Sequence, residues 1–144
     1  MKRYQRILIA IDIYADFDRV LQRALSIAIR PDNCSLVFVT LPSTYFQPYI
    51  SGVGGEFLID VKQQAQARLN DIAANCNIPA RQIYTPTGHI AKEIQTLAEE
   101  INADLIVIGT HGQSGLSLLL GATANEVLHG VKQDVLAVRL TAIN

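Results

Sequence analysis

Three short and almost uninterrupted runs of aliphatic and β-branched residues constrain the fold of this chain more than any other feature. They cover residues 6–12, 35–41 and 104–109, and none shows the strict alternation of apolar and polar residues that marks a half-buried strand. Runs of this length suit strands that helices cover on both faces, which is the usual environment of a parallel β-sheet. The sequence therefore predicts a parallel sheet buried between two layers of helices.

The segments between these runs carry apolar residues at intervals of three or four, as amphipathic helices do. A weaker strand contains Pro86, which has no N–H group to donate, and is expected at a sheet edge. We expect four helices: one from Asp16 or Asp18 to the residue before Pro31, and others over residues 58–76, 88–102 and 121–129. Two further strands are expected over residues 81–86 and 134–140. A long loop is expected over residues 42–55. Five strands alternating with four helices indicate an open five-stranded parallel α/β sheet with right-handed crossovers, and residues 1–144 are expected to form a single domain.

The balance of charge and hydrophobicity limits the partners of the chain. Twelve Lys and Arg residues against thirteen Asp and Glu residues give a net charge of −1, and hydrophobic residues make up 49% of the chain. We therefore expect neither nucleic acid nor a membrane as a partner, since the surface is not basic and the longest apolar run is far below the ~20 residues of a membrane span. No signal peptide is recognised, and Cys34 and Cys76 lie in apolar or helical segments, so we expect buried reduced thiols and a cytoplasmic protein. The apolar excess also points to self-association as a homodimer.

Residues at the carboxyl ends of the predicted strands are the first candidates for a site, because open parallel sheets bind ligands there. Asp12 ends the first run, where its carboxylate can accept hydrogen bonds from ribose hydroxyls or cap the following turn. Gly109, Gly112, Gly115 and Gly121 follow or end the fourth predicted strand and precede the fourth helix. Their backbone N–H groups and the helix N-terminus can hold phosphate, and the other interpretation is a tight loop that requires positive φ angles.

The sequence contains no recognisable catalytic set. The glycine segment lacks the Lys-Ser or Lys-Thr pair of a Walker loop and the G-x-S-x-G spacing of a nucleophile elbow, which makes Ser114 a loop hydroxyl. His89 and His129 are expected at the surface or at helix ends, whereas His111 lies within the glycine segment, near any phosphate bound there. No histidine stands at metal-ligand spacing from a second His or a Cys in the sequence. We therefore expect neither an enzyme nor a metal site.

Three segments of the chain resemble the universal stress protein family. Residues 7–12 resemble its opening strand, residues 103–112 its fourth strand and the following loop, and residues 135–138 its closing strand. The resemblance covers nearly the whole chain and implies a Rossmann-like sheet, of the kind found in adenine nucleotide alpha hydrolases, with the strand order 3-2-1-4-5. In that order the first and fourth strands are neighbours, so Asp12 and Gly109 would border one site.

Members of this family that bind ATP carry the motif G-x2-G-x9-G-[ST]. Gly109 and Gly112 match it, but eight residues precede Gly121, and Ala122 replaces the hydroxyl residue, so that Thr123 would have to supply the hydroxyl. The resemblance implies ATP, accompanied by Mg²⁺, as the ligand. The nucleotide contacts that it implies are Ala10, Ile11, Asp12, Val39, Ile108, Gly109, His111, Gly112, Gly121, Ala122 and Thr123.

The resemblance also implies a homodimer joined through the last strand, with Val135, Leu136, Ala137 and Val138 at the contact. The function that we expect is that of a cytoplasmic stress-response dimer that binds ATP or a related adenine nucleotide without efficient catalysis. Two alternatives stay open. One is an interaction or scaffold dimer of the UspA-like branch, which lacks the glycine motif, and the other is a slow ATPase.

Overall fold

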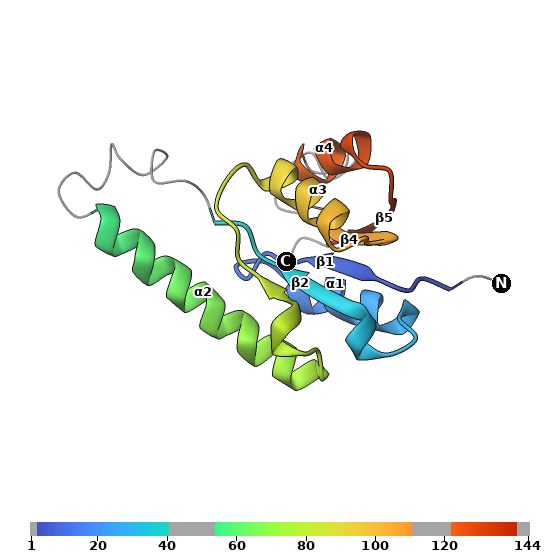
Figure 1. Cartoon of the computed structure of the whole chain (residues 1–144), viewed down its shortest axis with the longest axis horizontal. Coiled ribbons are helices and arrows are strands. Elements are labelled where there is room, and N and C mark those ends of the chain that lie inside the picture. Colours follow the sequence, from blue (N-terminus) through green and yellow to red (C-terminus); the bar gives the residue numbers. More distant parts are fainter. Residues whose placement is uncertain (1–2, 41–53, 111–121, 141–144) are drawn as a thin grey trace.

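The computed structural model describes the backbone of residues 3–40, 54–110 and 122–140 and the side chains of residues 3–40, 62–110 and 123–140. Strands and helices alternate along the chain as the sequence predicts (Figure 1). In order they are β1 (Ile7–Ala10), α1 (Phe17–Ile27), η1 (Pro31–Asn33), β2 (Cys34–Val37), α2 (Gly54–Cys76), η3 (Ala80–Gln82), β3 (Ile83–Tyr84), α3 (Ile90–Glu100), β4 (Leu105–Thr110), α4 (Ala122–Gly130) and β5 (Asp134–Arg139), where η denotes a short 3-10 helix. Every expected strand and helix is present, with ends that differ by a few residues from the predictions.

All five strands form one parallel sheet in the order β3-β2-β1-β4-β5. The strand order implied by the family resemblance is thus confirmed, and so is the edge position of β3, the strand that precedes Pro86. β1 lies at the centre, where Ala10 is level with Val37 of β2 and with Ile108 of β4. The carboxyl ends of these three strands therefore meet at one edge of the sheet.

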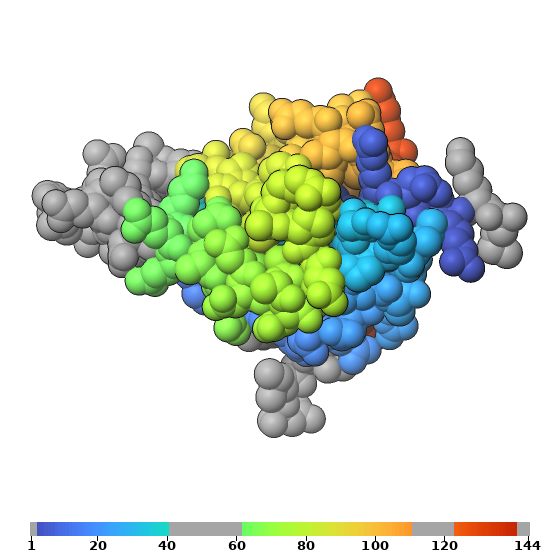
Figure 2. Space-filling view, turned by 60° about the horizontal axis from the view of Figure 1, so that its bottom comes forward, coloured from blue at the N-terminus to red at the C-terminus, as the bar shows by residue number. Residues whose placement is uncertain are grey.

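Each face of the sheet carries its own hydrophobic core. Successive residues of β1 point to opposite faces, so Ile7 and Ile9 belong to one core and Leu8 to the other. The first core packs against α1 and α2 and the second against α3 and α4, and Figure 1 shows the two pairs of helices on opposite sides of the sheet. Figure 2 shows the green helix α2 beside the blue segment that contains α1. Burial of both strand faces explains why the apolar runs in the sequence are continuous.

The first two helices differ from the predictions at their ends. α1 ends at Ile27, and Ile29, which lies within the predicted range of the helix, is beyond its end and is 41% exposed. The backbone is already extended at Ala28, with φ −64° and ψ 142°, so the helix ends before the restriction that Pro31 places on Arg30 applies. α2 begins at Gly54, so the last two residues of the predicted loop at 42–55 belong to the helix.

The third strand is shorter than predicted, and the fourth begins and ends one residue later than predicted. Residues 80–82 form the 3-10 helix η3, which reduces the third strand to Ile83–Tyr84. Asp104 precedes β4 and does not belong to it. Its carboxylate accepts hydrogen bonds from the backbone N–H groups of Gln5 and Arg6, at 2.8 and 3.0 Å, and so fixes the segment before β1 beside β4.

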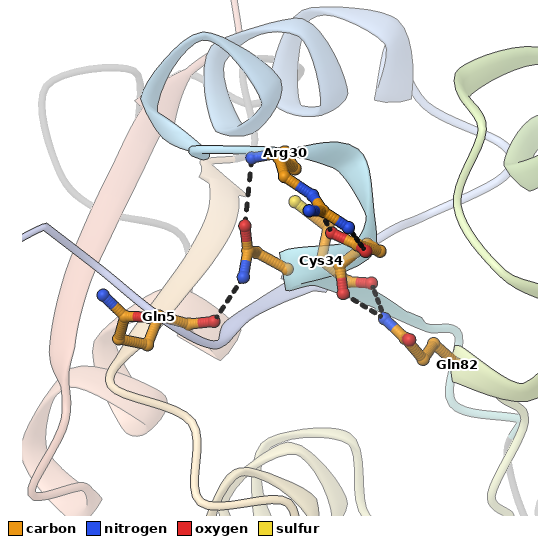
Figure 3. A network of polar contacts seen from close by, with 6 residues as sticks. Gln5, Arg30, Cys34 and Gln82 are labelled. Carbon is orange, nitrogen blue, oxygen red and sulfur yellow. Dashed lines mark hydrogen bonds and ion pairs between the residues drawn. The ribbon is translucent and has the colours of Figure 1, made fainter.

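A network of polar contacts surrounds the amino end of β2 (Figure 3). The side-chain amide of Gln82 donates to the carbonyl oxygen of Cys34 at 2.6 Å. The side-chain amide of Asn33 donates to the carbonyl oxygen of Gln5 at 3.0 Å, and its oxygen accepts from the backbone N–H of Arg30 at 3.0 Å. These bonds join the segment before β2 to the segments before β1 and β3.

The two cysteines differ in burial. The Cys34 side chain is fully buried in the core under α1 and α2, Cys76 at the end of α2 is half-buried, and both thiols are free. The predicted burial is therefore confirmed in full for Cys34 and in part for Cys76. Burial raises the pKa of the Cys34 thiol from its ordinary 9.0 to about 11.

The buried thiol predicts a loss of stability at alkaline pH. The Cys34 thiol ionises near pH 9.0 when the chain is unfolded but keeps its proton up to about pH 11 when the chain is folded. Between these values only the unfolded state releases the proton, so the free energy of unfolding should fall as the pH rises, with a contribution of about 2–3 kcal/mol from Cys34. Urea unfolding across this range measures the fall, and Cys34→Ala should show a smaller one. Equal pH slopes for the two proteins would contradict the prediction.

Candidate functional site

The chain leaves the central strands β1 and β4 toward opposite faces of the sheet. α1, which follows β1, places Val20 and Leu21 in one core, whereas α4, which follows β4, places Ala124 and Val127 in the other. Because β1 and β4 are neighbours, the winding direction of the sheet reverses between them. Open parallel sheets bind ligands at this position, beyond the carboxyl ends of the strands. The candidate site therefore lies at the carboxyl ends of β1 and β4.

Three of the apolar residues that the family resemblance assigns to a nucleotide share one face of the sheet. Ala10 is level with Ile108, and both contribute to the core under α3 and α4, as does Val39. Ile11 points the other way, into the core under α1 and α2, while its backbone N–H donates to the Val37 carbonyl oxygen at 2.9 Å. The structure thus brings Ala10, Val39 and Ile108 to one side and places the Ile11 side chain on the opposite side.

Asp12 is exposed and forms the turn that follows β1. Its Oδ1 atom accepts a hydrogen bond from the backbone N–H of Tyr14 at 2.9 Å, and its carbonyl oxygen accepts from Ala15 N–H at 3.1 Å. The turn-forming role predicted for Asp12 is confirmed. Asp16 occupies the N-cap position of α1, which confirms the predicted start of the helix, but its side chain makes no hydrogen bond to the helix, and Asp18 lies in the first turn. The turn made by Asp12 leads the chain into α1 instead.

Gly109 has a packing role. A Cβ atom added to Gly109 would lie 2.9 Å from Leu140 Cδ1 and 3.0 Å from Val20 Cγ2. Gly109 does not have a positive φ angle, so the tight-loop interpretation does not apply to this residue. The next residue, Thr110, is buried and accepts a hydrogen bond from the backbone N–H of Leu140 at 3.4 Å. The end of β4 is therefore packed closely between Val20 of α1 and Leu140, which directly follows β5.

Part of the predicted phosphate site falls in the chain between β4 and α4. His111, Gly112 and Gly121 lie outside the described residues. α4 begins at Ala122, so Thr123, which is half-buried, stands in its first turn. The backbone N–H groups of a first helical turn have no partners within the helix, and they are the groups that bind phosphate at helix N-termini.

Two threonines that sequence reasoning did not single out extend the same edge of the sheet. The hydroxyl oxygens of Thr40 and Thr87 lie 2.8 Å apart, and Thr40 also donates from its backbone N–H to the Pro86 carbonyl oxygen at 2.9 Å. The Thr40 carbonyl oxygen accepts from Gly88 N–H at 3.0 Å. One feature of the sequence pointed to Thr40: the apolar run of the second strand extends to residue 41, beyond the last residue of β2. These contacts join the carboxyl ends of β2 and β3 beside the candidate site.

The described histidines occupy surface positions, as predicted. His89 caps α3, where its Nδ1 accepts from Lys92 N–H at 3.4 Å, and His129 is exposed in the last turn of α4. The structure also brings His89 Nε2 to 3.5 Å from Glu126 Oε2, a contact that no pattern in the sequence predicts. The His89–Glu126 contact joins α3 to α4.

A surface hollow of about 470 Å³ lies at the opposite edge of the sheet, near the start of β5. α3 lines it on one side with Gln95, Glu99 and neighbouring residues, and the segment from Gly130 to Gln133 lines it on the other. Glu99 accepts a hydrogen bond from Gln133 and contacts Lys132, and the bond from Gln133 holds the pKa of Glu99 below its ordinary value. The Glu99 carboxylate in this hollow is therefore already engaged within the chain.

Within residues 3–40, 62–110 and 123–140, no group of three or more His, Cys, Asp or Glu side chains could hold a metal ion. None of the helices described by the structure is both long enough and apolar enough to cross a membrane.

Comparison with known proteins gives one consistent result. The model of the universal stress protein family matches residues 3–139. Universal stress protein A homolog 2 of Coxiella burnetii is 33% identical to the chain, over 97% of the chain and 98% of that protein. Universal stress protein A homolog 1 of the same organism is 35% identical, over 94% of the chain and 96% of that protein.

Solved structures have the same architecture. The universal stress protein UspA from Lactobacillus plantarum superposes with a TM-score of 0.76, at 21% identity, over 96% of the chain and all of that structure (100%). A universal stress protein in complex with cAMP superposes with a TM-score of 0.59, at 26% identity, over 96% of the chain and 98% of that structure. The first comparison shows the Rossmann-like α/β fold.

The packing of Gly109 predicts that Gly109→Ala destabilises the protein before any ligand is considered. The added methyl group must displace Leu140 or Val20, and such overpacking costs about 1–3 kcal/mol. Thermal or urea unfolding measures the change. In a double-mutant cycle with Leu140→Ala, the substitution at Gly109 should cost less, because the crowded methyl group of Leu140 is gone. Unchanged stability in Gly109→Ala would contradict this account.

Proposed function

Because the chain belongs to the universal stress protein family, we propose that it binds an adenine nucleotide, ATP or a relative of ATP, at the carboxyl ends of β1 and β4. The observation that carries the proposal is the position of Asp12, exposed at the point where α1 and α4 leave neighbouring strands toward opposite faces. The existence of a family member of the same fold in complex with cAMP supports the same class of ligand.

The base and the ribose would be held by different parts of this edge. Ala10, Val39 and Ile108 offer an apolar surface to the base, and Ile11 contributes its backbone. Tyr14 N–H engages Oδ1 of Asp12, and no hydrogen bond to Oδ2 occurs within the described residues, which leaves Oδ2 to accept from a ribose hydroxyl. The turn-forming and ligand-binding roles of Asp12 are therefore compatible.

The phosphates would be held by backbone N–H groups. Residues 109–123 contain no Lys or Arg, so the groups available are the amides of Gly109, Gly112 and Gly121 and those of the first turn of α4, at Ala122 and Thr123. The Thr123 hydroxyl and the His111 imidazole would add side-chain donors. Mg²⁺ would enter bound to the phosphates of ATP.

We propose that the protein binds the nucleotide without hydrolysing it efficiently. Among the site residues, Asp12 and His111 are the two with ionisable side chains, and the Asp12 carboxylate is engaged by Tyr14 N–H. This leaves no set of nucleophile, base and orienting group for hydrolysis. Phosphate release above the background of a Gly109 variant would reveal the slow ATPase alternative. We also place the protein in the cytoplasm, as a single domain, where the free Cys34 and Cys76 would stay reduced.

A homodimer through β5 completes the proposal. β5 pairs with β4 on one side, and within the described residues its other side has no strand partner. Leu128 of α4 is 44% exposed. It lies about 200° around the helix from Glu126, which contacts His89 at the start of α3, so Leu128 faces away from α3. Val135, Leu136 and Ala137 are half-buried, whereas Val138 is buried within its own core, so Val138 would contribute mainly backbone to the contact.

The interaction or scaffold dimer is the alternative function. Several relatives are named universal stress protein A or its homologs, and the spacing before Gly121 is one residue shorter than the ATP motif of the family. The two functions differ in one measurable property, the affinity for an adenine nucleotide.

Asp12 offers a matched pair of variants for the nucleotide proposal. In Asp12→Asn the side-chain oxygen still accepts from Tyr14 N–H, but the second oxygen is replaced by an NH2 group that cannot accept from ribose. We expect unchanged thermal stability and about tenfold weaker ATP binding in this variant. In Asp12→Ala both the turn and the ribose contact are lost, so stability should fall as well.

Calorimetric titration of nucleotide-free protein with ATP, and separately with cAMP, measures these affinities. Neither heat nor thermal stabilisation of the wild type at millimolar nucleotide would reject nucleotide binding and favour the scaffold alternative. Wild-type affinity in Asp12→Asn would show that the site lies elsewhere.

The dimer proposal predicts a monomeric variant. In Leu128→Asp/Ala137→Asp, like charges would meet across the two-fold axis, so sedimentation should give a mass of 15.8 kDa instead of twice this value for the wild type. Ile29→Asp, another exposed apolar position, is the control and should remain dimeric. A monomeric wild type, or a double variant that still dimerises, would exclude the β5 interface.

A further inference from the structure

Tyr14 is the most exposed of the large hydrophobic side chains that the structure describes. Its exposure is 76%, compared with 44% for Leu128 and 41% for Ile29. A single exposed aromatic residue is common and needs no special explanation. Tyr14, however, follows the turn of Asp12 at the carboxyl end of β1, so its ring lies at the border of the candidate site.

Two contacts hold Tyr14 in place, one through its backbone and the other through its ring. The backbone N–H of Tyr14 donates to Asp12 Oδ1 at 2.9 Å. The ring meets the Phe38 ring in an edge-to-face arrangement, with 6.1 Å between centroids and 70° between planes. Side chains held in this way lose little conformational freedom when they bind a ligand.

Phe38 is held by a backbone hydrogen bond and by packing against the core. It follows β2 directly, and its backbone N–H donates to the Tyr84 carbonyl oxygen at 3.1 Å, which continues the pairing of β2 with β3. The Phe38 side chain is half-buried against the core under α1 and α2. Tyr14 is thus supported from the α1 and α2 side of the sheet.

The apolar residues of the candidate site lie on the other side. Ala10, Val39 and Ile108 belong to the core under α3 and α4. A planar group that enters beyond the strand ends would have these aliphatic side chains on one side and the Tyr14 ring on the other. A nucleobase is planar and gains binding energy from an aromatic ring stacked on its face.

We propose that Tyr14 stacks on the base of the bound nucleotide and favours purines over pyrimidines, an inference that rests on the nucleotide-binding function proposed above. A purine presents two fused rings to Tyr14 and a pyrimidine one, so the purine gains more from the stack. Removal of an aromatic stacking partner weakens binding by about five- to a hundredfold per base. Tyr14 is then a specificity-determining residue that acts on the base and not on the phosphates.

The test compares three ligands with three variants of nucleotide-free protein. The ligands are ATP, CTP and inorganic tripolyphosphate, which has no base. The variants are Tyr14→Ala, Tyr14→Phe, which keeps the ring, and Ile29→Ala, which removes an exposed apolar side chain at the opposite edge of the sheet. Calorimetry gives the dissociation constants, and thermal unfolding confirms that each variant is folded.

We expect Tyr14→Ala to bind ATP at least fivefold more weakly than the wild type, to lose less affinity for CTP, and to bind tripolyphosphate as the wild type does. Tyr14→Phe and Ile29→Ala should keep wild-type affinities. Unchanged ATP affinity in Tyr14→Ala would overturn the stacking role while nucleotide binding stands, and would assign the exposed ring to another contact, such as a protein surface. An equal loss for ATP and tripolyphosphate would also overturn it. A wild type that binds no nucleotide would reject the proposed function and this inference together.

Discussion

Parallel pairing of β1 with a strand on each side is the constraint on which the rest of this structure depends. Ile7, Leu8 and Ile9 are fully buried, and they alternate between two cores that different pairs of helices cover. A strand in this position cannot tolerate a charged side chain on either face, because an unpaired buried charge is costly. The first charge after β1, Asp12, therefore stands where the strand has ended and the backbone turns toward α1.

The same pairing concentrates the candidate site at one edge. Right-handed crossovers take α1 and α2 to one face as the chain moves from β1 to β3, and take α3 and α4 to the other face as it returns through β4 to β5. The segments after β1 and β4 must separate for this reason. Asp12, Gly109 and the first turn of α4 come to one edge although more than a hundred residues separate the first from the last. The site is a consequence of the winding and not of a local motif.

The sequence predicted the strands well where a continuous run of aliphatic residues marked them. β1 and β4 are continuous aliphatic runs, and their predicted positions match the structure to within about two residues. The sheet order came from the family resemblance, because the pattern of apolar residues does not state which strands are neighbours. Signals that depend on distant partners were missed: the crowding of Gly109 depends on Val20 and Leu140. Likewise, the His89–Glu126 contact depends on how α3 and α4 pack, and neither residue reveals it in the sequence.

The absence of Lys and Arg from residues 109–123 has a consequence for how any nucleotide would be recognised. Backbone amides hold phosphate through short-range hydrogen bonds, whereas a lysine would add a long-range charge that attracts any polyanion. A site built from amides gains little from the total charge of the ligand, so discrimination between ligands must come from geometry and from the base and ribose. The apolar face of Ala10, Val39 and Ile108, the carboxylate of Asp12 and the ring of Tyr14 are the groups positioned for that discrimination. The groups that would select a nucleotide act on its base and ribose and not on the charge of its phosphates. A near-neutral chain can therefore bind a nucleotide selectively without attracting nucleic acid.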